Sequence, residues 1–170
     1  ASFPVCTNIG TSVFQQCSAL TSVSFPVCTS IGATTFQYCS ALTNVSFPVC
    51  TNIGNYAFYS CRSLASVSFP ACTSIGSYVF VYCYALTNAS FPACTNIGIG
   101  AFRNCSALES IYLNQFASLA DTSAFANTPM SNSTYLGRFG SIYVPASLIS
   151  QYQSATNWAA YSERFAVLSE

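Results

Sequence analysis

The chain has 170 residues, which is enough for one domain with a buried core. Its net charge is zero, because four arginines balance four acidic residues, and it contains no histidine. Nothing in this composition steers the protein toward nucleic acid or an anionic membrane, so those functions are excluded. The polar surface must come from Ser, Thr, Asn, Gln and Tyr, a composition common on secreted and surface proteins. No window holds the roughly 18 apolar residues of a membrane span.

The chain opens inside a repeat, with the sequence ASFPVC and no visible signal peptide. We interpret it as a processed protein or a fragment. Five units of 22 residues follow one another over about residues 1–110. Each unit divides into two half-turns, Phe-x-x-Cys-x-x-Ile and Phe-x-x-Cys-x-x-Leu. In the first unit the recurring residues are Ser2, Phe3, Pro4, Cys6, Thr7, Ile9, Gly10, Phe14, Cys17 and Leu20.

The repeat length favours a solenoid of short extended segments, because helical repeats need roughly 33 residues or more. The segment Leu20 to Pro26 (LTSVSFP) is predicted to form the main strand, with Val23 and Phe25 facing inward. The proline ends the strand because it has no N–H to donate. We expect Gly32 to turn the chain at a positive φ, which a residue without Cβ adopts readily. Stacked coils would then align their Phe, Ile and Leu residues in internal columns.

These residues resemble the BspA-like leucine-rich repeats, whose pattern Ser74 to Pro92 (SIGSYVFVYCYALTNASFP) follows at nearly every fixed place. The resemblance is strong over residues 1–113 and weak over 114–145. It implies a β-rich α/β fold: a right-handed leucine-rich-repeat solenoid of 22-residue coils with parallel strands. Proteins of this family attach bacteria to host matrix proteins or to other cells, and the resemblance implies the same kind of function here.

The period decays after Leu113. In Thr122 to Met130 (TSAFANTPM), Phe125 keeps its place while Thr128 stands where a cysteine is expected. Ser141 to Val144 reads as a last strand. Apolar residues then recur at roughly helical steps: Leu148, Ile149, Tyr152, Ala155, Trp158 and Tyr161. We therefore divide one domain into a solenoid over 1–145, degenerate from 114, and a helical cap over 146–170 that covers its exposed end.

The ten cysteines recur every eleven residues from Cys6 to Cys105. Disulfides are the usual explanation for an even count in an extracellular chain. However, equivalent cysteines in stacked coils would share a rotamer and keep their sulfurs about 5 Å apart, which is too far for a bond of about 2 Å. Zinc needs ligands that converge, and this uniform spacing without histidine does not provide them. We favour a ladder of free, buried thiols that pack as small apolar groups.

No enzymatic site is recognisable. A cysteine or serine nucleophile needs a base, and histidine is missing. The four carboxyl groups form no recognisable pair, and no glycine-rich phosphate loop occurs. We therefore predict a protein that is not an enzyme and that needs no cofactor and no metal.

The two residues after each repeat glycine, and those that flank the second cysteine, vary between units, and we expect them to be exposed. Stacking brings these positions together as a candidate partner-binding surface: Tyr38, Tyr56, Tyr59, Arg62, Tyr78, Tyr82 and Tyr84, with Arg103 nearby. Tyrosine and arginine are favoured at binding surfaces. The alternative is that the tyrosines cover a poorly charged surface and bind nothing. For the face that carries Ser24, Ser46 and their equivalents we favour simple solvation.

The sequence thus predicts a non-enzymatic adhesion module, secreted or on a cell surface, that binds a host matrix or cell-surface protein or a glycan. It predicts neither nucleic-acid binding nor membrane insertion. The alternative is a structural spacer or stalk segment of a larger surface or phage-tail protein.

Overall fold

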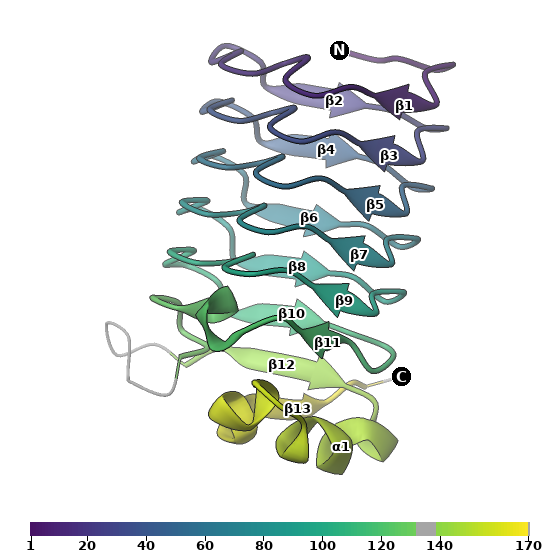
Figure 1. Ribbon diagram of the computed structural model, residues 1–170. Helices are drawn as coiled ribbons and strands as arrows, with labels where there is room; N and C mark the ends of the chain where they lie inside the picture. Colours follow the sequence, from purple (N-terminus) through teal and green to yellow (C-terminus); the bar gives the residue numbers. More distant parts are fainter. Residues whose placement is uncertain (132–138, 170) are drawn as a thin grey trace.

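The computed structural model describes residues 1–131 and 139–169. The chain winds into a stack of coils, with the N-terminus at one end and short helices at the other (Figure 1). Parallel strands of successive coils pair in register, as in the pairs Ile9–Ile31 and Ile31–Ile53. This confirms the predicted repeat solenoid.

Each regular coil contributes strands to two sheets. The predicted main strand forms, although it is shorter than expected, and a second strand of two residues follows it in each coil. The first sheet has the order β13-β12-β10-β8-β6, and β2 and β4 pair separately. Because β4 lies beside β6, we call all seven strands the first sheet: β2 (Ser22–Ser24), β4 (Asn44–Ser46), β6 (Ser66–Ser68), β8 (Asn88–Ser90), β10 (Ser110–Tyr112), β12 (Ser141–Val144) and β13 (Phe165–Val167).

The second sheet has six strands in the order β1-β3-β5-β7-β9-β11. They are β1 (Asn8–Ile9), β3 (Ser30–Ile31), β5 (Asn52–Ile53), β7 (Ser74–Ile75), β9 (Asn96–Ile97) and β11 (Ser118–Leu119). The expected alternation holds in β2, where Val23 is buried between two serines, and Phe25 beyond it is also buried.

A third ladder of hydrogen bonds joins the coils in the segment after the glycine. There the N–H groups of Thr34, Phe36 and Tyr38 donate to carbonyls of the next coil at 2.8–2.9 Å. Two residues of each coil take a positive φ in this segment, for example Thr34 at 54° and Tyr38 at 63°. The prediction for Gly32 was wrong in this respect, because the residue with positive φ is Thr34, two places later.

The repeat glycine is needed for close approach instead. A Cβ on Gly32 would lie 2.6 Å from the carbonyl carbon of Gly10 in the preceding coil, and one on Gly98 would lie 2.6 Å from that of Gly76. Both distances are shorter than a real Cβ contact. The backbones of adjacent coils therefore lie so close together at these glycines that no side chain fits between them.

Two columns of phenylalanine rings fill the core. Neighbouring rings stack nearly parallel, with centroids 5.2–5.5 Å apart from Phe14 through Phe36, Phe58, Phe80 and Phe102 to Phe125. The other column, from Phe3 to Phe91, meets the first at tilted or edge-on angles, as Phe25 meets Phe36. Phe125 keeps its place in the degenerate coil, as predicted.

The cysteines form two rows beside these columns, and eight of the ten are buried. In the row that begins at Cys6, each thiol donates to the carbonyl two residues later, at 3.2–3.4 Å. In the row that begins at Cys17, the thiols from Cys39 onward reach the phenylalanine carbonyl of the preceding coil, as Cys83 reaches Phe58 at 3.2 Å. Burial raises the pKa of the Cys39 thiol to about 11.

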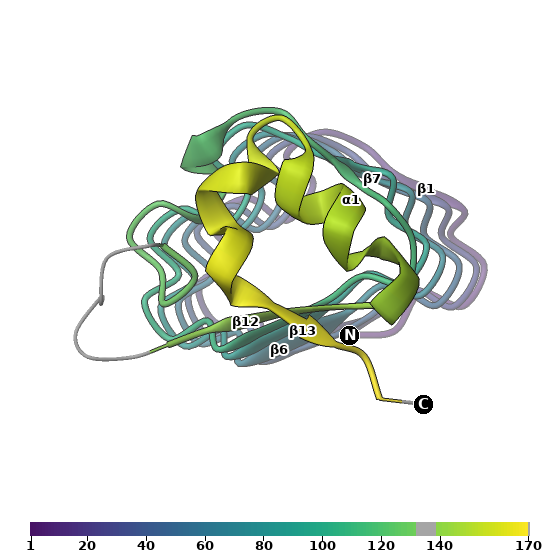
Figure 2. The same cartoon turned by 90° about the horizontal axis from the view of Figure 1, so that it is seen from below.

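The far end of the stack is covered by short helices, which lie across the last coil (Figure 2). They are η2 (Ala146–Leu148), α1 (Ile149–Ser154) and η3 (Trp158–Arg164), while η1 (Thr122–Phe125) lies within the degenerate coil. Tyr152, Trp158 and Tyr161 are buried, as their helical spacing suggested. The sequence did not predict β13, which follows η3 and pairs with β12.

Candidate functional site

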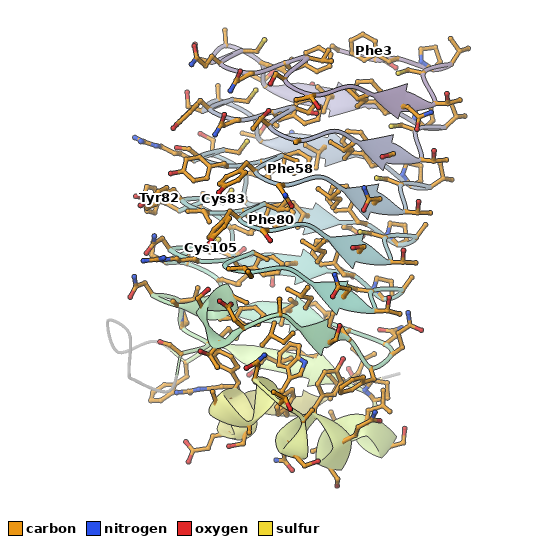
Figure 3. The ribbon with its side chains drawn as sticks, in the orientation of Figure 1. Phe3, Phe58, Phe80, Tyr82, Cys83 and Cys105 are labelled. Atoms are coloured by element: carbon orange, nitrogen blue, oxygen red, sulfur yellow. The ribbon has the colours of Figure 1, made fainter. Side chains whose placement is uncertain are left out.

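The predicted tyrosines lie on the third ladder and on the residues that follow it. Two columns of this ladder hold residues with positive φ. One column contains Ser12, Thr34, Tyr56, Tyr78 and Gly100, and the other contains Gln16, Tyr38, Ser60, Tyr82 and Asn104. Figure 3 shows Tyr82 at the outer edge of the coils.

Left-handed backbone conformations are unfavourable for bulky residues, by roughly 1–2 kcal/mol each. Gly100 and Asn104 in the fifth coil are the residue types that accept this conformation most readily. Tyrosine occupies the same columns four times in the second to fourth coils, at φ values of 59–63°. Backbone strain of this kind is characteristic of functional positions.

Six tyrosines form one continuous cluster through ring contacts. We call them the tyrosine cluster: Tyr38, Tyr56, Tyr59, Tyr78, Tyr82 and Tyr84. Tyr59 lies at the centre, with its ring centroid 5.6 Å from that of Tyr38, 5.9 Å from Tyr56 and 5.4 Å from Tyr82. Tyr56 stacks on Tyr78 at 5.1 Å, and Tyr82 contacts Tyr84 at 5.8 Å. The structure therefore brings together all six predicted tyrosines.

The rings of the cluster differ in exposure. Tyr38, Tyr56 and Tyr84 are exposed by 37–44 %, while Tyr59, Tyr78 and Tyr82 are partly buried. Burial, followed by the neighbouring phenols, raises the pKa of Tyr59. The Tyr59 phenol is therefore a neutral hydrogen-bonding group at physiological pH.

The two predicted arginines are placed differently. The Arg62 guanidinium lies 5.9 Å from the centroid of the Tyr84 ring and donates from Nε to the Ser60 hydroxyl at 3.2 Å. Arg103 is exposed two coils beyond Arg62, and its main-chain carbonyl accepts a hydrogen bond from the N–H of Tyr82. Arg62 is thus held within the cluster, and Arg103 adjoins it through the backbone.

The expectation that all variable positions are exposed was wrong at three places, because Gly100, Val81 and Ser60 are buried. Val81 is 4 % exposed and separates Arg103 from Tyr59 in their shared column. Ser60 is 2 % exposed and holds the Arg62 side chain, a role that sequence reasoning missed. The sequence indicated that Ser60 differs from its column. It is a small residue at the place of Tyr38 and Tyr82, whose larger side chains point outward.

A hollow at the C-terminal end of the stack is lined by Asn114, Pro145, Ala146, Val167, Leu168 and Ser169. None of these side chains is titratable, so the hollow offers no general acid or base. In the part of the chain that the structure describes, no three His, Cys, Asp or Glu side chains gather as a metal site. Over the same residues, no helix is both long and apolar enough to cross a bilayer.

The fold and the exposed cluster define a repeat solenoid with a variable, tyrosine-rich edge. The family model described as the BspA type leucine rich repeat region matches residues 7–132 in six copies. The chain therefore belongs to this family, which confirms the resemblance seen in the repeat. A search of curated proteins found no match.

Three solved structures are similar. A leucine-rich repeat protein of T. pallidum is 31% identical with a TM-score of 0.62, over 66% of this chain and 58% of that one. One from Bacteroides ovatus is 30% identical with a TM-score of 0.53, over 68% of this chain and 37% of that one. A leucine-rich cell surface protein of Faecalibacterium prausnitzii is 22% identical with a TM-score of 0.53, over 87% and 55%, and shows the fold alone. The chain thus spans less than two thirds of each of these proteins.

Proposed function

We propose that the protein is a non-enzymatic binding module of a secreted or cell-surface protein, and that the tyrosine cluster with Arg62 contacts a protein or glycan partner. The observation that carries the proposal is the backbone conformation. Tyr38, Tyr56, Tyr78 and Tyr82 hold left-handed positions where other coils of the same chain use Ser, Thr, Gln, Gly or Asn. A chain that needed these positions only for folding would gain stability from glycine or asparagine.

The chemistry of the cluster suits adhesion. Tyrosine supplies a large contact area with little loss of side-chain entropy, and its hydroxyl adapts to varied hydrogen-bonding partners. The mutual ring contacts restrict the side chains before binding, which lowers the entropic cost of association. Arg62, held by Ser60 and Tyr84, adds a charged donor at one border. The family membership supports an extracellular location.

The chain itself supplies substitutions for a test, because other coils show which residues each column accepts. One variant combines Tyr38→Gln, Tyr59→Gln, Tyr56→Ser, Tyr82→Ser and Tyr84→Ser, which are the residues at the equivalent places of other coils. A control variant combines Asn44→Ser and Asn88→Ser in the first sheet, where Ser22 and Ser66 are the equivalents.

Binding of the three proteins would be measured on immobilised matrix proteins and on a glycan array. We expect the wild type and the control to bind alike, and the tyrosine variant to lose at least ~10-fold in affinity, as loss of an aromatic hot spot does. Equal binding by the tyrosine variant would refute the site. If the wild type binds nothing in either panel, the spacer interpretation would replace the binding module.

A further inference from the structure

The solvent-facing side of the first sheet carries a second group of tyrosines. Tyr112 in β10 and Tyr143 in β12 lie directly opposite each other in the parallel pairing. Their rings stack with centroids 4.9 Å apart and planes 10° from parallel. Each tyrosine follows a buried isoleucine and is itself partly exposed, so both side chains point outward. Among the described residues, neither ring contacts the tyrosine cluster.

Each ring of this pair has one face against its partner and one face turned away. Neighbouring strands lie about 4.8 Å apart, so the rings stack along the direction that joins the strands. The outer face of Tyr112 is therefore directed over β8 and β6, where Ser90 and Ser68 occupy the same column. Figure 1 shows these strands side by side. A serine side chain is too short to cover a phenol ring, so this ring face is open to a ligand.

The groups beside this ring face are hydroxyls that the protein does not use. Among the described residues, no protein group forms a hydrogen bond with the side-chain hydroxyl of Ser68, Ser90 or Tyr112. The threonines that precede the strands of the second sheet differ in this respect. The hydroxyls of Thr51 and Thr73 donate to carbonyls of the preceding coil at 3.1 Å. The serine column therefore keeps its donors and acceptors for a ligand. On the other side of the pair, Tyr143 faces an alanine, which offers no such group.

The surroundings of this site are uncharged. None of the seven strands of the first sheet contains Asp, Glu, Lys or Arg. Glu109, immediately before β10, carries a negative charge that disfavours an anionic ligand. An open aromatic face beside a few hydroxyl groups, without a charge to pair, matches a neutral ligand that has one apolar face and several hydroxyls.

We propose that the outer face of Tyr112, together with Ser90 and Ser68, binds the pyranose ring of a neutral sugar in a glycan. The C–H face of the sugar stacks on the phenol ring, at the level that a tyrosine in β8 would occupy. Its hydroxyl groups exchange hydrogen bonds with the serine hydroxyls and with the Tyr112 phenol. Tyr143 is a positioning residue, because its ring supports that of Tyr112 from behind. The proposal does not depend on the tyrosine cluster.

The test is a titration of the isotope-labelled protein with the methyl glycosides of glucose, galactose, mannose and N-acetylglucosamine, followed by amide chemical shifts. We expect at least one sugar to shift the amides of Ser68, Ser90 and Tyr112, with a dissociation constant on the order of 1 mM, because the site is shallow. If no sugar shifts these amides at ten times that concentration, the proposal is overturned. Shifts confined to the tyrosine cluster would overturn it too, while leaving the function proposed for that cluster intact.

The repeat supplies the variants. Tyr112→Ser combined with Tyr143→Ser introduces the residue that the same column holds in β2, β4, β6 and β8, and it should weaken binding at least ~10-fold. Tyr56→Ser combined with Tyr82→Ser, in the tyrosine cluster, is the control and should leave this affinity unchanged. Equal affinity of the first variant and the original protein would refute the site.

Ser90→Tyr gives a second measurement that removes no ring. It extends the stack by one coil, fills the place of the sugar, and presents a new ring face over β6. We therefore expect the sugar-induced shifts to move to Ser46 and Ser68, with a similar affinity. Shifts that stay in place in this variant would contradict stacking on the outer ring face. A response to a proline-rich peptide or to indole, with all four sugars silent, would overturn the proposal in favour of another class of ligand.

Discussion

A single cysteine in this fold fills space and also donates a hydrogen bond. The sequence indicated small buried groups, but it did not indicate that the thiols of Cys61, Cys83 and Cys105 satisfy phenylalanine carbonyls of the coil before. Thr128, at the end of the same row, is also a donor, but it donates to a phenylalanine carbonyl of its own coil. It replaces a cysteine in the degenerate coil, is fully buried, and donates to the Phe125 carbonyl at 2.7 Å. A donor of small volume is therefore retained at this position even where the repeat decays.

We expect Cys83→Ala to lower the free energy of unfolding by about 1–3 kcal/mol, through a small cavity and one lost hydrogen bond. Cys17→Ala is the matched control, because it changes an exposed member of the same row and should cost less than about 0.5 kcal/mol. Urea unfolding followed by circular dichroism measures both. Equal costs for the two variants would contradict the role given to the buried thiol.

At the level of elements, the sequence predicted the main strand of each coil, but it predicted neither the two-residue strands nor the left-handed positions. Val23 and Phe25 alternate with serines, and this period of two identifies a strand directly. Strands such as β1 contain two residues, which is too short for any alternation to be visible. The left-handed positions were missed because Thr34, Tyr56 and Tyr82 are not residues that indicate positive φ. The stacking of the coils imposes this conformation on them.

The terminal elements of residues 146–170 make polar contacts with the last coil. Trp158 donates from Nε1 to the Ala117 carbonyl at 2.7 Å, and the Tyr152 hydroxyl accepts the Ala117 N–H at 2.8 Å. The Asn157 side chain donates to the Leu119 carbonyl at 2.8 Å. Trp158 and Asn157 thus satisfy carbonyls that a further coil would otherwise pair with, while Tyr152 satisfies an N–H that donates to the preceding coil in the regular repeat. We propose on these contacts that 146–170 acts as the cap of the 1–145 solenoid within one domain.

Trp158→Ala tests this proposal. The ring is fully buried and lies 5.9 Å from the ring of Phe125, the last of its column. Its removal should lower the free energy of unfolding by about 3–5 kcal/mol. It should also increase binding of a hydrophobic dye at the exposed column end. Ser150→Ala, on the exposed face of α1, is the control and should change neither property. A loss of stability without dye binding would show that Trp158 stabilises its own segment but does not close the column.

At the scale of the whole molecule, cohesion comes from ring columns and backbone ladders, since only eight residues are charged. The repeat period predicted these columns because one residue type recurs at each core position. The candidate site was partly predicted for the same reason, as stacking places variable positions side by side. The burial of Val81 was not predictable, because the other residues of its column, such as Tyr59 and Arg103, are not buried.

The titration of buried thiols predicts an alkaline transition. Burial raises the pKa of Cys39, Cys50 and Cys94 from 9.0 to about 11. A raised pKa in the folded state means that the stabilisation is complete below pH 9 and is lost as the pH rises toward 11. Few groups titrate between pH 5 and 8, since the chain has no histidine. The urea midpoint should therefore be constant over that range and fall above pH 9.

Cys17→Ala should leave this pH profile unchanged, while Cys94→Ala should make the fall above pH 9 shallower, because it removes one buried group that ionises. A midpoint that stays constant up to pH 11 would contradict the link between buried thiols and stability.

The state of the ten cysteines is the last prediction, and it concerns the whole stack. Equivalent thiols repeat in the same orientation from coil to coil, which keeps their sulfurs about 5 Å apart and unable to bond without movement of the backbone. Native protein treated with iodoacetamide near pH 8 should react first at Cys17, which is exposed, and then at Cys6, which is half-buried. The buried thiols should react slowly, because the thiolate is the reactive form and burial disfavours it. After denaturation without reductant, mass spectrometry should find ten alkylated cysteines. A smaller number would mean that oxidised pairs join the coils and that the thiol donors described above are not all present.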